Sequence, residues 1–147
     1  MAVSKAVRDL VEAMASRETA KAQQMIEALP DSEKKQYVDY VAAVFAALLD
    51  DHFKDGVNRD AIAALVSQIR KDYRNAEQPI KGWTLEGVIR ASCGESWIFD
   101  ELSDNDIVTN QLLVITSLST EGTVTRPDLY KFLDEGEEIM AEWESEA

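Results

Sequence analysis

The sequence predicts an all-α fold, a single compact domain over residues 1–147 with about seven helices that are mostly antiparallel neighbours. Apolar residues recur at steps of three and four along most of the chain, which is the spacing of one helix face. Residues that typically begin or end helices stand between these stretches, so the connections are short. No fixed-period repeat of the kind found in solenoids is present.

The first half of the chain predicts four helices. Their apolar faces fall within residues 3–14, 22–29, 37–53 and 62–73. Ser16 and Asn58 are expected to cap the second and fourth helices, because short polar side chains accept hydrogen bonds from the free amides of a first turn. Pro30 interrupts the pattern after the second helix, and Gly56 is expected to end the third in a left-handed conformation.

A loop at residues 75–79 leads into the second half, which predicts a shorter helix over 80–93. Gly94 is expected to end this helix. The apolar periodicity then breaks over residues 95–102, which indicates a turn or one short helix.

Residues 107–118 are rich in β-branched side chains and are compatible with a helix or a strand. A helix is favoured, because no second strand is available to pair with this one. Ser103 and Asp106 form an acidic version of the capping box at its start, and Gly122 is expected to end it. Thr125 is expected to cap the last helix, whose apolar face includes Leu129, Phe132, Leu133, Ile139, Met140 and Trp143.

The negative charge of the chain is unevenly distributed. The net charge is −13, but residues 1–75 carry 12 acidic and 11 basic residues, whereas residues 76–147 carry 16 acidic and 4 basic residues. Such a field repels nucleic acid and anionic membranes and attracts basic proteins. We therefore expect no binding to nucleic acid or membrane, and a basic protein as the partner.

The chain shows no sign of a targeting or membrane-spanning segment. Its N-terminus is amphipathic and unlike a signal peptide, and its densest apolar stretch, residues 41–49, is too short to span a bilayer. Cys93 is the only cysteine, which excludes an internal disulfide and a multi-cysteine zinc site. These features predict a cytoplasmic protein.

Few residues suggest catalysis or metal binding. His52 and Cys93 are the only histidine and cysteine, and whether they pair as base and nucleophile depends on the fold. Segments 51–62 and 117–128 place glycine where a calcium loop requires it, but apolar residues or serines occupy positions of acidic ligands. We expect no catalytic residue, no cofactor and no metal, and a protein that is not an enzyme.

The segment 95–106 is the main candidate for a partner-binding surface, because it mixes acidic residues with large apolar ones. Aromatic anchors surrounded by charged groups are typical of interaction hot spots, and acidic groups steer a basic partner. The candidate residues are Glu95, Trp97, Phe99, Asp100, Glu101, Asp104 and Asp106. The alternative is that Trp97 and Phe99 fill the core while the acids only solvate a loop.

The C-terminal segment 134–147 is a second acidic region. It holds seven acidic residues and no basic one, and acids at a helix C-terminus oppose the helix dipole, so its last turns should fray unless they dock.

The leading hypothesis from the sequence is an acidic interaction module, for example an antidote or immunity protein that inhibits a basic toxin. The alternative is a structural or regulatory subunit, or a homo-oligomer, that uses the apolar face of 107–118. The sequence leaves the oligomeric state open.

Overall fold

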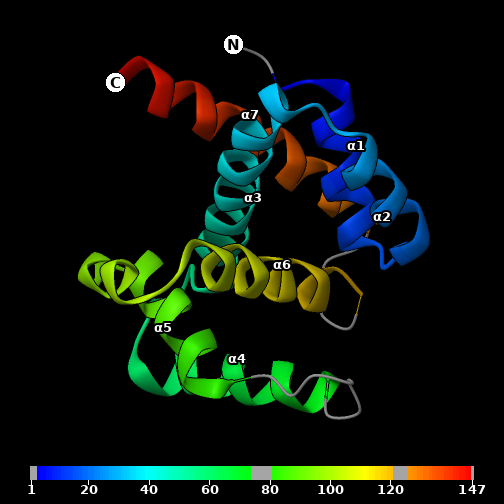
Figure 1. Ribbon diagram of the computed structural model, residues 1–147. Helices are drawn as coiled ribbons and strands as arrows, with labels where there is room; N and C mark the ends of the chain where they lie inside the picture. The colour runs from blue at the N-terminus through cyan, green and yellow to red at the C-terminus, as the bar shows by residue number, and fades with distance from the viewer. Residues whose placement is uncertain (1–2, 74–80, 121–125, 147) are drawn as a thin grey trace.

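The computed structural model describes residues 3–73, 81–120 and 126–146, which contain helices and no strand (Figure 1). The predicted all-α class is confirmed, and the segment 107–118 is helical. The elements in chain order are α1 (Lys5–Ala15), α2 (Thr19–Ala28), α3 (Asp31–His52), α4 (Arg59–Asp72), α5 (Gly82–Ser92), the 3-10 helix η1 (Ser96–Glu101), α6 (Asp104–Thr120) and α7 (Arg126–Glu146). The element η1 is the short helix anticipated at 95–102.

Two helices organise the packing. Helix α3 contacts α1, α6 and α7, and helix α6 contacts α1, α3, α4 and α5. Figure 1 shows α3 running through the centre with α6 lying across it, so that α6 connects α1, α3 and α7 to α4 and α5. Most of the buried apolar side chains form one cluster, whose largest members on α3 are Tyr40, Phe45 and Leu48.

Three of the predicted helix ends are confirmed. The Asn58 side chain accepts a hydrogen bond from the Ala61 amide at 2.8 Å, and the Ser103 hydroxyl accepts one from the Asp106 amide at 3.1 Å. Gly94 follows α5 with a φ of +125°, a conformation that costs glycine little. These contacts satisfy backbone groups that a helix end leaves without partners.

The prediction that Ser16 caps the second helix is wrong. Its amide continues α1 by donating to the Glu12 carbonyl at 3.0 Å, so Ser16 is the C-cap of α1. Arg17 then turns the chain with a left-handed φ of 58°, and the Glu18 amide donates to the Ala13 carbonyl at 3.0 Å. This is a Schellman motif with arginine at the position that usually holds glycine, which is why the sequence conceals it.

The third helix differs from its prediction at its C-terminal end. It begins at Asp31, directly after Pro30, and ends at His52 with Phe53 as C-cap. Gly56 has the expected positive φ of 118°, but it lies in the following turn and does not end the helix itself. The loop predicted at 75–79 and the helix signals at Gly122 and Thr125 lie outside the described residues.

Helix α7 is tied to the start of the chain and to α3. Arg8 of α1 forms ion pairs with Asp134, at 2.7 Å, and with Glu137. The buried Tyr40 hydroxyl of α3 donates a hydrogen bond to the Leu133 carbonyl at 2.8 Å. Beyond these contacts α7 continues as helix to Glu146, and the side chains of residues 141–146 are exposed.

We expect Tyr40→Phe to lower the free energy of unfolding by about 1 kcal/mol, because the substitution removes this hydrogen bond without opening a cavity. Urea denaturation measures the change. Tyr130→Phe is the matched control, because its hydroxyl donates to Glu12 at an exposed site, where we expect a loss below about 0.5 kcal/mol. Equal losses for the two variants would contradict the assignment of a structural role to the buried hydroxyl.

Candidate interaction surface

The element η1 presents Trp97 to solvent because its neighbour Ile98 is anchored in the fold. Ile98 is buried, and its Cγ2 atom would lie 3.3 Å from a Cβ placed on Gly87, so the bare glycine of α5 allows this close approach. Trp97 is 57% exposed, and Phe99 is half-buried. The structure therefore does not place Trp97 in the core.

An ion pair fixes the start of the segment to α5. The Arg90 guanidinium donates through Nε and Nη2 to both carboxylate oxygens of Glu95, at 2.6 and 2.8 Å. The Glu95 amide also donates to the Arg90 carbonyl at 3.1 Å across the turn at Gly94. The hydrogen bonds from Arg90 lower the pKa of Glu95. Glu95 is thus already paired and serves to hold η1 in place.

The other acidic residues of the candidate surface are exposed. Asp100 and Glu101 lie in η1, while Asp104 and Asp106 lie in the first turn of α6. Asp106 belongs to the capped turn, since its amide is bound by Ser103 and its carbonyl accepts from Asn110 at 2.7 Å. Asp104 alone of these four lines a groove that faces α3.

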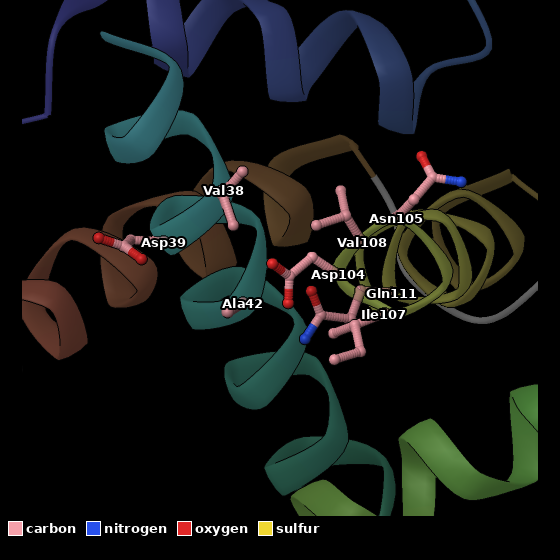
Figure 2. A pocket seen from close by; sticks show the side chains of 8 residues that line it. All are labelled: Val38, Asp39, Ala42, Asp104, Asn105, Ile107, Val108 and Gln111. Atoms are coloured by element: carbon pink, nitrogen blue, oxygen red, sulfur yellow. The ribbon is translucent and has the colours of Figure 1, made fainter. Parts of the chain in front are cut away.

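This groove lies between α3 and α6 and has a volume of about 400 Å³ (Figure 2). Its lining residues are Val38, Asp39 and Ala42 of α3 and Asp104, Asn105, Ile107, Val108 and Gln111 of α6. The volume falls within the range of pockets that bind small groups. Only Asp104 of the seven predicted surface residues takes part in it, and the sequence does not reveal that α3 supplies the opposite wall.

Gln111 is the unusual member of the groove. It is 4% exposed, and its Oε1 atom is buried without a hydrogen-bond partner. In Figure 2 its side chain extends from α6 toward α3, and Asp104 lines the same groove. A buried acceptor without a donor costs about 1–3 kcal/mol, so this arrangement opposes folding. The only signal in the sequence is a glutamine within the apolar stripe of 107–118.

Asp39 contributes less to the groove than its position suggests. Its carboxylate accepts a hydrogen bond from Lys35 Nζ at 2.8 Å, one turn earlier on α3. Figure 2 shows the Asp39 side chain directed away from α6. Of the two acidic residues in the lining, the one in the space between α3 and α6 is therefore Asp104.

A second cavity contains Cys93 but has no histidine in its lining. It measures about 310 Å³ and lies among Ala46, Leu49, Asp50, Phe53, Val57, Ser92 and Cys93. Burial raises the pKa of the Cys93 thiol, and the negative charge of Asp50 raises it further. A catalytic cysteine needs the opposite shift, because the thiolate is the nucleophile. His52 is exposed and contacts the ring of Phe53 edge-on, with centroids 4.9 Å apart.

Among the residues that the structure describes, no group of three or more histidine, cysteine, aspartate or glutamate side chains is arranged to hold a metal ion. None of the described helices combines the length and the apolar character needed to cross a membrane. Comparison of the chain with protein-family models, curated proteins and solved structures gives no match.

Proposed function

We propose that this chain is an acidic interaction module that binds a basic protein partner through the surface 95–106, without catalysing a reaction. The observation that carries the proposal is the exposure of Trp97 beside the exposed carboxylates of Asp100 and Glu101. An exposed tryptophan among acidic residues is a candidate anchor, because tryptophan is one of the residues enriched in interaction hot spots.

Electrostatics support a basic partner. The half of the chain that contains this surface carries 16 acidic residues against 4 basic ones. Of the candidate acids, Glu95 has its cation in Arg90, whereas the others stand in exposed positions. Exposed acids of one sign accelerate the encounter with a basic protein, while the aromatic ring provides short-range contact.

A concrete form of this function is an antidote or immunity-type inhibitor of a basic toxin such as a nuclease. In that case the acidic side chains take the place of nucleic-acid phosphates in the groove of the toxin, and Trp97 packs against its surface. A nucleic-acid-binding surface is positively charged and would repel a basic toxin. Inhibition of such a toxin and direct binding of nucleic acid therefore require surface charges of opposite sign.

The alternative function uses the apolar face of α6 to join a larger complex or a second copy. Val114, Ile115 and Leu118 of that face are buried in the core of the chain itself. This packing occupies the face and favours the acidic surface as the interface.

Affinity capture at two salt concentrations tests the proposal. The chain is immobilised, incubated with extract of its native cell, and the retained proteins are identified by mass spectrometry. We expect a basic partner whose affinity falls about tenfold or more between about 0.05 and 0.5 M salt, because salt screens exposed charges. A bait with Asp100→Asn and Glu101→Gln should retain less of it at low salt.

Two results would count against the module. One is the retention of neutral or acidic partners only, with no dependence on salt. The other is a stable homo-oligomer in light scattering whose association persists at high salt, which would support the apolar alternative.

A further inference from the structure

We propose that the groove between α3 and α6 receives an arginine side chain of the basic partner. This inference rests on the proposed function and extends it, because Asp104 belongs both to the candidate surface 95–106 and to the groove. The groove has three relevant properties: an acceptor without a donor, a carboxylate in its lining, and apolar walls.

The acceptor is Oε1 of Gln111, which has no hydrogen-bond partner although the residue is 96% buried. Folding alone does not explain why a polar group stands there, since an apolar side chain of the same length would avoid its cost. The terminal torsion of a glutamine amide is soft, so the oxygen can turn toward a donor that enters the groove. The missing partner is therefore a hydrogen-bond donor.

The carboxylate of Asp104 in the same groove favours a positively charged donor. Figure 2 shows the carboxylate in the space between α6 and α3, and Gln111 lines the same groove. A charged donor that reaches both groups forms a charge-assisted hydrogen bond with Asp104 and a second bond with Gln111. The net charge of −13 favours the approach of such a group over that of an anion.

The apolar walls favour arginine over lysine. Val38, Ala42, Ile107 and Val108 line the groove and offer contact to the aliphatic stem of a long cationic side chain. The guanidinium group is planar, is less strongly hydrated than an ammonium group, and carries five N–H donors in a fixed fork. It can donate to more than one acceptor at once, and Asp104 and Gln111 both offer acceptors in the lining of the groove. The volume of about 400 Å³ accommodates one such side chain.

Titration with model peptides tests the inference. The probe is an acetylated and amidated peptide of alternating glycine and arginine, compared with the same peptide containing lysine or citrulline. Citrulline has the shape of arginine without its charge. Binding is followed by amide chemical shifts of the isotope-labelled chain and by calorimetry at low salt. We expect the arginine peptide to shift amides at residues 38–42 and 104–111 and to bind more tightly than the other two.

Matched variants locate the site. Asp104→Asn should weaken the arginine peptide about tenfold, since a charge-assisted bond is lost. The control Asp60→Asn removes the same charge from the first turn of α4, outside both the groove and the surface 95–106, and should change the affinity less than about twofold. Equal effects of the two substitutions, or tight binding of the citrulline peptide, would overturn the inference.

Gln111→Met separates binding from folding. It should weaken the arginine peptide about threefold to fivefold and raise the midpoint of thermal unfolding by about 2–4 °C, because an unpaired acceptor leaves the core. A lower midpoint would mean that the amide is part of the fold and would overturn the inference. So would an unchanged affinity.

Different results would contradict the groove assignment and the proposed function. If Trp97→Ala weakens a captured basic partner while the two groove variants do not, the proposed function stands and the groove assignment is wrong. If the arginine peptide binds the groove as described but no basic protein is captured, the groove assignment stands and the proposed function is wrong.

Discussion

Gly136→Val should lower the free energy of unfolding by about 3 kcal/mol, because it forces an extra side chain into a packed contact. A Cβ at Gly136 would lie 2.7 Å from Cγ2 of Val44 and 3.1 Å from Cε1 of Tyr40. Both neighbours are fully buried on α3, and a β-branched valine has little freedom to move aside. The absence of a side chain at Gly136 is what allows α7 to approach α3. Thermal unfolding should show a decrease of roughly 10 °C.

Two further variants distinguish overpacking from a general effect on the helix. Ala141→Val places the same side chain at an exposed position of α7, where we expect a loss of about 0.5 kcal/mol from helix propensity alone. Gly136→Ala combined with Val44→Ala should cost less than the sum of the two single changes, because the second change removes the atom that obstructs the first. Additive losses would contradict a direct contact between these positions.

Trp97→Ala should weaken binding of the basic partner by roughly 30-fold, which corresponds to about 2 kcal/mol. The ring is 57% exposed and sits on a 3-10 helix that is anchored by Ile98 and by the ion pair of Arg90 with Glu95. A side chain held in this way loses little conformational freedom when a partner covers it. Surface plasmon resonance measures the change, which should appear mainly as faster dissociation.

Other exposed tryptophans supply the controls for this result. Trp83, on α5, is 70% exposed and lies outside the segment 95–106, so Trp83→Ala should change the affinity less than about twofold. Trp143 is 43% exposed in the acidic end of α7. If Trp143→Ala weakens the partner and Trp97→Ala does not, the interface is the C-terminal segment 134–146 and not the surface 95–106.

The fold class and most helix ends follow from local chemistry, which a sequence displays directly. Asn58, Ser103 and Gly94 act on backbone groups within a few residues of themselves, so their roles are readable without the fold. Arg17 shows the limit of this reasoning. Arginine is an unfavourable residue for a left-handed turn. The conformation is accompanied by the hydrogen bonds of Glu18 and its neighbours and by the position of the Arg17 guanidinium 5.0 Å from the centroid of the Tyr73 ring, contacts that the local sequence does not display.

The candidate sites depend on contacts between distant segments, which local patterns do not encode. The exposure of Trp97 follows from the burial of Ile98 against Gly87, and the groove follows from the packing of α3 against α6. The sequence shows that the segment 95–106 combines acidic and large apolar residues. It does not show that Glu95 is paired with Arg90 or that Asp104 lines the groove.

The contact between α3 and α7 has a consequence for the synthesis of this protein. The Tyr40 hydroxyl and the Leu133 carbonyl that it binds are 93 residues apart in the chain. At the usual rate of translation, roughly 5 to 20 seconds pass between the emergence of these two residues. During that interval the side of α3 that contains Tyr40 and Val44 has no α7 to cover it. The nascent chain therefore exposes an apolar face of α3 for seconds. Chaperones can bind this face until α7 has emerged and covers it.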